Sequence, residues 1–223
     1  MKDLIADSMK EKGFILLKSS NEEDYFNIIS SLGETLYQTE VKMQAGKSNV
    51  VYNPQEILFH TDYPKADFVS WFCVNSGNRE APLELIDTVN IRKMDADTLE
   101  TLRGIKVGFK CKIDREIYEA PLILDYKFGI GTTYNPWGLQ SEMTDEQKSC
   151  YDKLLKIFED AERLVIDIDQ GDILIIDNRR MLHGRREIAE NSPRHLTRVF
   201  IKDVNSNIPL EYSSTDNRQS VYE

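Results

Sequence analysis

Two histidines and one aspartate stand at spacings that could bind a metal ion. His60 and Asp62 form a His-x-Asp triplet in LFHTDYP, beside sequence typical of a β-strand. Residues i and i+2 of a strand project from the same face, so this imidazole and this carboxylate can reach one ion from one side. His183 lies far downstream in MLHGRREI, in another predicted strand. If the two strands are neighbours, the three side chains form a 2-His-1-carboxylate set, which leaves three positions open on an octahedral iron.

Arginines gather around His183, although the formal net charge of the chain is −10. Residues 175–198 contain Arg179, Arg180, Arg185, Arg186, Arg194 and Arg198. Arg194 and Arg198 are four apart in a predicted strand and therefore share a face. A guanidinium at such a position can hold a carboxylate through two parallel hydrogen bonds. We interpret Arg179 and Arg180 as turn residues that are solvated or paired with acidic neighbours, and Arg185 as either a group behind His183 or a surface salt bridge.

Two stretches of the chain resemble a known family. FHTDYPKADFVSWFCV and GDILIIDNRRMLHGRREIAENSPRHLTRVFI are similar to the Fe(II)/2-oxoglutarate-dependent oxygenases of the taurine dioxygenase and clavaminate synthase superfamily. The resemblance covers the middle and the end of the chain, and the second stretch is the more specific. It implies a double-stranded β-helix (jelly-roll) core with His60, Asp62 and His183 as iron ligands. It also implies Arg194 for the C5 carboxylate of 2-oxoglutarate and Arg198 for an anionic group of the prime substrate, with the opposite assignment left open.

The reaction that this resemblance implies uses Fe(II), 2-oxoglutarate and O2, releases succinate and CO2, and hydroxylates an unactivated C–H bond. The presence of Asp62 favours hydroxylation over halogenation, while desaturation and ring formation stay open. The implied substrate is a small carboxylate-bearing molecule, with an amino acid or a derivative favoured. Tyr52, Asn53 and Trp137 are candidates for its pocket, and each is equally readable as a turn or core residue.

One departure from the family pattern keeps alternatives open. Many members carry a Gly-Gly-x-Thr segment whose threonine touches 2-oxoglutarate, and alignment on Asp87 puts Leu83 at that position. An iron oxygenase that does not use 2-oxoglutarate is therefore one alternative. A non-catalytic jelly-roll binding module is another, although it would usually have lost part of the ligand set.

Length and composition exclude several classes of protein. The 223 residues are 40% hydrophobic and 30% charged, which is typical of a globular chain. The acidic balance argues against a nucleic-acid or anionic-membrane binder, and no apolar run is long enough to span a membrane. The three cysteines, Cys73, Cys111 and Cys150, are widely spaced and suit a reducing cytosol. We expect a cytoplasmic protein that acts on a small molecule; its oligomeric state stays open.

The hydrophobic pattern predicts a mainly β domain with flanking helices over residues 1–223, in which 205–223 form a flexible tail. Ser20, Asp95 and Thr144 are expected to cap helices, and Gln170–Asp172 to form a tight hairpin turn between two strands. The helices are expected over residues 1–13, 20–33, 94–105 and 143–162. The strands are expected over residues 14–18, 49–52, 56–62, 68–74, 82–89, 107–113, 122–135, 164–169, 171–178, 181–188 and 196–204.

Overall fold

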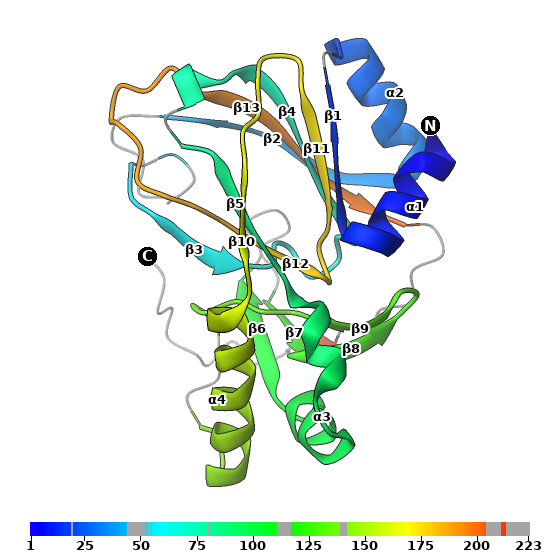
Figure 1. Cartoon of the computed structure of the whole chain (residues 1–223), viewed down its shortest axis with the longest axis vertical. Coiled ribbons are helices and arrows are strands. Elements are labelled where there is room, and N and C mark those ends of the chain that lie inside the picture. The colour runs from blue at the N-terminus through cyan, green and yellow to red at the C-terminus, as the bar shows by residue number, and fades with distance from the viewer. Residues whose placement is uncertain are drawn as a thin grey trace.

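Two antiparallel β-sheets pack face to face at the centre of the computed structural model (Figure 1). The structure describes residues 1–18, 20–43, 52, 54–79, 81–110, 117–138, 142–203 and 211–212. One sheet has the strand order β1-β11-β4-β13-β2 and the other has the order β10-β5-β12-β3. The strands are β1 (Phe14–Leu17), β2 (Glu34–Lys42), β3 (Ile57–His60), β4 (Phe68–Asn75), β5 (Leu83–Asp87), β10 (Arg163–Ile166), β11 (Ile173–Asp177), β12 (Met181–Arg185) and β13 (His195–Lys202). This arrangement confirms the predicted jelly-roll core.

Side chains alternate along the strands of the five-stranded sheet, and this alternation explains which residues lie on its inner face and which on its outer face. On β4, Trp71 and Cys73 point into the core between the sheets, while Phe68 and Phe72 belong to a separate cluster on the outer face. The run Ile173–Ile176 of β11 is apolar throughout because both of its faces are covered. The inner face of this sheet therefore forms one wall of the space between the sheets.

Two helices cover the outer face of the five-stranded sheet. These are α1 (Lys2–Lys12) and α2 (Glu22–Leu32), which lie together beside β1 in Figure 1. Gly13 ends α1 in the left-handed conformation with φ 75°. The N-cap of α2 is Asn21, whose side chain accepts a hydrogen bond from Asp24 N, so the prediction of Ser20 was wrong by one residue. An asparagine carbonyl caps as well as a serine hydroxyl, which is why the sequence did not separate the two.

A second layer packs against the outer face of the four-stranded sheet through Ile86 and Leu182. The predicted caps are confirmed, since Asp95 accepts from Thr98 N and Thr144 forms a capping box with Gln147. The layer contains α3 (Ala96–Arg103), α4 (Asp145–Asp160), β6 (Lys106–Lys110), β7 (Ile117–Pro121), β8 (Ile123–Tyr126), β9 (Gly129–Thr132) and β14 (Glu211–Tyr212). Two 3₁₀ turns, η1 (Gly77–Arg79) and η2 (Thr88–Lys93), follow β4 and β5.

The predicted hairpin at Gln170–Asp172 was wrong. The turn is present, with φ 85° at Gly171, but β10 pairs with β5 in one sheet and β11 pairs with β1 and β4 in the other. The turn therefore carries the chain from one sheet to the other, as jelly-roll connections do.

Some predictions fall on residues that the structure does not describe. The expected strand at 49–52 lies outside the described residues apart from Tyr52, and so does the expected tail at 205–223 apart from Glu211–Tyr212. Conversely, β2, β7 and β14 were not predicted, and β14 falls within the expected tail, where it pairs with β7. Within the described ranges, no helix has the length and apolar character needed to cross a membrane.

Candidate metal centre

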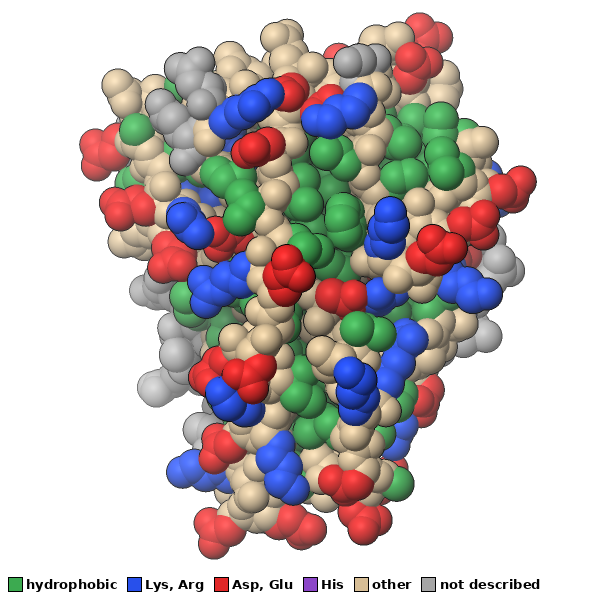
Figure 2. All heavy atoms as spheres, in the orientation of Figure 1, with side chains coloured by type: hydrophobic (Ala, Val, Ile, Leu, Met, Phe, Trp, Pro, Cys, Tyr) green, Lys and Arg blue, Asp and Glu red, His purple; other side chains and the backbone are tan. Residues whose placement is uncertain are grey.

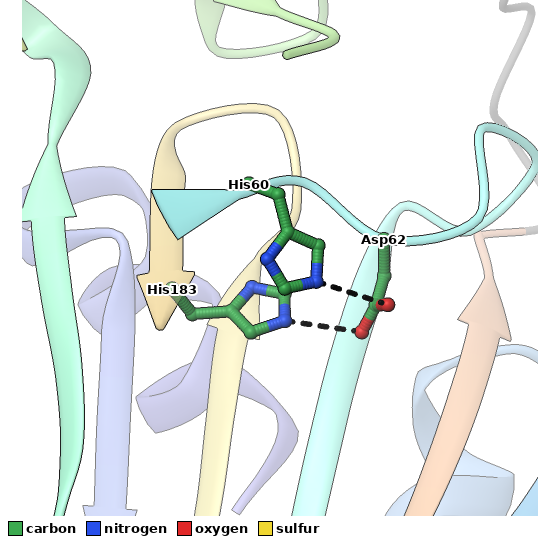
Figure 3. Close-up of side chains that lie close together, drawn as sticks. All are labelled: His60, Asp62 and His183. Atoms are coloured by element: carbon green, nitrogen blue, oxygen red, sulfur yellow. Dashed lines mark ion pairs between the residues drawn. The ribbon is translucent and has the colours of Figure 1, made fainter. Parts of the chain in front are cut away.

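Three side chains predicted to bind a metal converge in the structure. One potential ligand atom from each of His60, Asp62 and His183 lies within 4.8 Å of the others. His183 Nε2 is 3.1 Å from Asp62 Oδ2, and His60 Nε2 is 3.7 Å from Asp62 Oδ1. Figure 3 shows both imidazoles directed at this carboxylate. The convergence follows from the pairing of β3 with β12, in which His60 and His183 are direct partners.

The position of Asp62 differs from the prediction in one respect. β3 ends at His60, and Asp62 lies in the loop that follows it. The His-x-Asp triplet thus crosses a strand end instead of lying along one face of a strand. Figure 3 shows Asp62 on this loop, facing the two histidines. The backbone of Asp62 is therefore held by hydrogen bonds of the loop and not by a β-ladder.

The protonation states of the cluster suit metal ligation. His60 Nδ1 lies 2.7 Å from Leu58 O, an arrangement in which Nδ1–H donates to this carbonyl and Nε2 keeps its lone pair. Burial and the neighbouring His60 lower the pKa of His183 to about 4, so its imidazole is neutral at pH 7. Burial alone would raise the pKa of Asp62, but the charge of Arg198 and the interaction with His183 outweigh it and hold this pKa well below its usual value. The cluster therefore offers the neutral imidazole of His183, the Nε2 of His60 and one carboxylate.

The donor set and its unsatisfied nitrogens fit an iron ion. His183 is 4% exposed, and neither of its ring nitrogens has a hydrogen-bond partner among the described residues. The 3.1 Å contact of its Nε2 with Asp62 therefore lacks hydrogen-bond geometry. A buried polar atom without a partner is costly unless something else satisfies it. Two imidazoles and one carboxylate with open positions are the ligand set of non-haem Fe(II) oxygenases.

The cluster opens into a cavity between the two sheets. The cavity measures about 580 Å³, including space open to solvent. None of the described histidines is visible on the molecular face in Figure 2, where acidic and basic side chains are interspersed. Besides the cluster itself, the cavity is lined by Val41, Ile57, Trp71, Leu83, Trp137, Gly184, Arg185, Arg194, Leu196 and Arg198. The wall is thus mainly apolar, with three guanidinium groups.

Arg194 supplies a buried cation at this cavity. Its side chain is 7% exposed, and no carboxylate within the described residues pairs with its guanidinium. Burial and the nearby Arg185 lower the pKa of Arg194 to about 10. A desolvated guanidinium that has a second cation nearby and no counter-ion is an energetically poor arrangement until an anion binds. The site can therefore receive a carboxylate at Arg194.

Arg198 lies on the same wall but is already engaged. Its Nη1 contacts both oxygens of Asp62, at 3.1 and 3.3 Å, and its guanidinium lies 4.7 Å from the centre of the Phe200 ring. Arg194 directly precedes β13, and with Leu196 and Arg198 it lines the cavity at every second position, so the two arginines share a wall as the sequence predicted. Of the two arginines, Arg194 is the one left without an acidic partner.

The contacts of the other arginines contradict part of the interpretation that was made from the sequence. Arg179 is 0% exposed and donates to Pro64 O, so it is not solvated. Arg180 pairs with Asp87 at 2.7 Å and donates to carbonyls at the end of α1. Arg185 is 4% exposed and donates to Gln55 O, which contradicts the surface salt bridge and favours a role behind His183. The turn is buried because β9 covers it, as the hydrogen bond from Thr132 N to Arg179 O shows.

The predicted substrate contacts have separate outcomes. Trp137 lines the cavity, with its ring centre 5.3 Å from that of His60. Tyr52 is not among the described lining residues, and its hydroxyl lies 3.3 Å from Thr39 Oγ1. Asn53 lies outside the described residues.

Two further wall residues bear on the site. Leu83 lines the cavity, so an alkyl group stands where the family threonine was expected. Sequence reasoning missed Trp71, whose ring centre is 5.1 Å from that of His183. Alternation along FVSWFCV was the signal that could have found it.

Comparison with known proteins gives one family match and several matches of fold. Residues 113–200 match the family model of the taurine catabolism dioxygenase TauD, TfdA family. This segment contains His183 and Arg194 and ends two residues after Arg198. No curated protein matches the chain in a comparison of sequences.

Three solved structures illustrate the similarity of fold, and two of them are oxygenases bound to iron. The non-heme iron oxygenase OrfP in complex with Fe and α-ketoglutaric acid has 16% identity and a TM-score of 0.72, covering 90% of this chain and 78% of that chain. The PvcB protein from Pseudomonas aeruginosa has 18% identity and a TM-score of 0.70, covering 96% and 84%. An asparagine oxygenase in complex with Fe(II), 3-hydroxyasparagine and succinate has 16% identity and a TM-score of 0.68, covering 91% and 80%. At sequence identities this low, the comparison establishes a similarity of fold only.

Proposed function

We propose that this chain, which belongs to the taurine dioxygenase and clavaminate synthase-like superfamily, is an Fe(II)- and 2-oxoglutarate-dependent oxygenase that hydroxylates a small carboxylate-bearing substrate. One observation carries the proposal. The ligand atoms of His60, Asp62 and His183 converge at a cavity whose wall also holds the unpaired guanidinium of Arg194. A metal site and a carboxylate site in one cavity are what a chelating keto acid requires.

Each part of the cavity has a role in the proposed reaction. His60, Asp62 and His183 hold the iron, and Arg194 binds the C5 carboxylate of 2-oxoglutarate. When bound, Fe(II) and 2-oxoglutarate supply the oxidation, in which O2 is consumed, succinate and CO2 are released, and a C–H bond becomes C–OH. The apolar wall, including Trp71 and Trp137, excludes water and orients the substrate.

The substrate class is inferred from the charge of the cavity. Arg185 and Arg198 line it in addition to Arg194, so an anionic group on the substrate is favoured. The neighbours of known structure include OrfP in complex with a hydroxylated arginine and an asparagine oxygenase with hydroxyasparagine. We therefore favour an amino acid or a derivative, with its carboxylate at Arg198. Trp137 is retained as a substrate contact, as are Tyr52 and Asn53 from the sequence.

The proposal treats residues 1–223 as one oxygenase domain. Both N-terminal strands support this, because β1 pairs with β11 and β2 pairs with β13 in the sheet that carries the arginines. A reducing, cytoplasmic location is part of the same proposal, and the free, buried thiols of Cys73 and Cys150 are compatible with it.

The test is an anaerobic titration of the purified chain with Fe(II) and then with 2-oxoglutarate. Bidentate chelation of iron by the keto acid is expected to produce a weak visible charge-transfer band. His183→Ala should abolish the band by removing a ligand, with the overall fold kept. His195→Ala is the matched control, because His195 pairs with Glu40 at the protein surface, 2.9 Å away, and this variant should keep the band.

The other outcomes separate the remaining hypotheses. Iron binding without the band would favour an oxygenase that does not use 2-oxoglutarate, an alternative that Leu83 keeps open. No iron binding at all would identify a non-catalytic binding module. If the band appears, amino acids and other small carboxylates can be screened by substrate-dependent release of succinate.

A further inference from the structure

The loop that carries Asp62 lies beyond the β-ladder that holds the two histidines. The pairing of β3 with β12 ends at His60 and His183, and residues 61–67 form no helix or strand. The histidines are thus fixed by their strands, whereas the backbone of Asp62 is held by contacts of the loop, and its carboxylate also receives hydrogen bonds from Arg198.

Asn178 makes those contacts with a fully buried side chain. Its side chain is 0% exposed, and its Oδ1 accepts a hydrogen bond of 2.9 Å from Asp62 N. Its Nδ2 donates to Ala66 O at 2.9 Å, with longer contacts to Tyr63 O and Asp62 O at 3.4 and 3.5 Å. The carboxamide therefore hydrogen-bonds to the backbone of this loop in the way that a peptide group of a neighbouring strand would.

The pattern of donors and acceptors permits one orientation of the carboxamide. An N–H faces Oδ1, and carbonyl oxygens face Nδ2. A flipped amide would place a donor against a donor and an acceptor against an acceptor. This requirement specifies asparagine, because aspartate lacks the donor and leucine lacks both groups.

Asn178 also connects the two segments that supply the ligands. It stands in the turn between β11 and β12, and β12 carries His183. Its own backbone N–H donates to Asp67 O at 2.9 Å, and the adjacent Arg179 donates to Pro64 O. The contact with Asp62 spans 116 positions of the chain. One turn thus sets both where β12, the strand of His183, begins and where Asp62 lies.

We propose that Asn178 is a positioning residue that holds the Asp62 carboxylate at the distance from His60 and His183 that iron binding requires. The inference rests on the proposed function, since it assumes that these three side chains hold the metal. Groups that orient metal ligands typically change metal affinity by about 10–100-fold when they are removed. Asn178 would act on the metal through Asp62 without touching the iron or the substrate.

The experiment measures the Fe(II) dissociation constant by anaerobic equilibrium dialysis, together with the unfolding free energy. Asn178→Ala should raise this constant about 10–100-fold. Asn178→Asp preserves the shape of the side chain but loses the donor to Ala66 O, and should also weaken binding. Tyr25→Phe is the control for stability alone, because it removes a buried 2.8 Å hydrogen bond to Ser70 in the cluster on the outer face of the five-stranded sheet. It should leave the Fe(II) constant unchanged.

A second measurement needs no variant. The amide of Asp62 should be protected from hydrogen exchange in the wild-type chain because it donates to a buried oxygen. Rapid exchange of this amide would overturn the inference, as would folded Asn178 variants with the wild-type Fe(II) constant. A wild-type chain that binds no Fe(II) overturns the proposed function itself, which is a different result from unchanged binding in the variants.

Discussion

Arg194 and Arg198 share one wall of the cavity but differ in what they already contact. Arg198 donates to Asp62, whereas Arg194 has no acidic partner among the residues described. The sequence predicted that both would face one cavity, because alternation along a strand is a local property. It left the assignment of the two arginines open, because the partner of Arg198 lies in the loop of Asp62, 136 positions away along the chain.

This difference predicts separate effects of the two arginines on co-substrate binding. Arg194→Ala should raise the 2-oxoglutarate dissociation constant about 10–100-fold, since a charged hydrogen-bond partner is lost, and should leave Fe(II) binding nearly unchanged. Both constants can be measured by the anaerobic titration. Arg186→Ala is the control, because Arg186 lies on the same stretch but is exposed and pairs with Glu84. A larger effect of Arg198→Ala than of Arg194→Ala on 2-oxoglutarate binding would reverse the assignment.

Asp177 predicts a pH dependence of stability outside the metal site. Burial raises the pKa of Asp177 to about 6, although hydrogen bonds from Arg179 N and the Tyr126 hydroxyl oppose this. A carboxyl with a raised folded-state pKa binds its proton more tightly when folded, so stability falls as pH rises from about 4 to about 6. The free energy involved is on the order of 3 kcal/mol.

The comparison with Asp177→Asn isolates this contribution, because asparagine imitates the protonated carboxyl. The unfolding free energy of the wild type should fall relative to that of Asp177→Asn between pH 4 and pH 6, and the difference should level off above that range. Denaturant unfolding at a series of pH values provides the measurement. Parallel curves for the two proteins would mean that Asp177 titrates normally.

At the scale of elements, the 3₁₀ turn η1 supports the base of Arg194. Gly77 has φ 61°, and a Cβ there would lie 2.8 Å from Cβ of Arg194 and 3.0 Å from its Cα. Only glycine satisfies both the conformation and the contact without strain. The turn therefore fixes the backbone from which the Arg194 guanidinium reaches the cavity.

Gly77→Ala should displace Arg194 and weaken 2-oxoglutarate binding, with a loss of stability of about 1–2 kcal/mol from the left-handed conformation. Gly129→Ala is the matched control. It has φ 115° and also carries the conformational penalty, but its nearest neighbour is the flexible side chain of Arg92 at 3.3 Å. Both variants should be destabilised, and only Gly77→Ala should change the 2-oxoglutarate constant. Equal 2-oxoglutarate dissociation constants in the two variants would show that η1 does not position Arg194.

Elements with local signals were predicted from the sequence, and those that depend on distant pairing were not. The caps at Asp95 and Thr144 were predicted because a cap is a bond within four residues. The turn at Gln170–Asp172 was misread because its local sequence suits a hairpin, whereas the choice of sheet depends on β5 and β4. The burial of Arg179 was missed for the same reason, since β9 covers it from elsewhere in the chain.

At the scale of the whole molecule, the metal would join parts of the chain that are far apart in sequence. His60 and Asp62 come from β3 and its loop, and His183 comes from β12. Fe(II) should therefore stabilise the native state, by about 2.7 kcal/mol when its free concentration is 100 times the dissociation constant. Anaerobic unfolding with and without Fe(II) measures this difference.

Matched variants control for non-specific effects of the metal on unfolding. His183→Ala should lose the stabilisation, whereas His195→Ala should retain it, since His195 contacts Glu40 instead of the cluster. Equal stabilisation of both variants would mean that Fe(II) binds elsewhere.

The topology of the two central sheets has a consequence for how the chain is made. Each pairing in them, as far as the described residues go, involves at least one of β10, β11, β12 and β13. The strands β1 to β5 therefore have no partners among themselves and remain unpaired on the ribosome until the segment from Arg163 onward emerges. Such non-local pairing slows folding and exposes strand edges meanwhile. We expect the nascent chain to depend on chaperones, and to acquire iron only after β12 and β13 have been made.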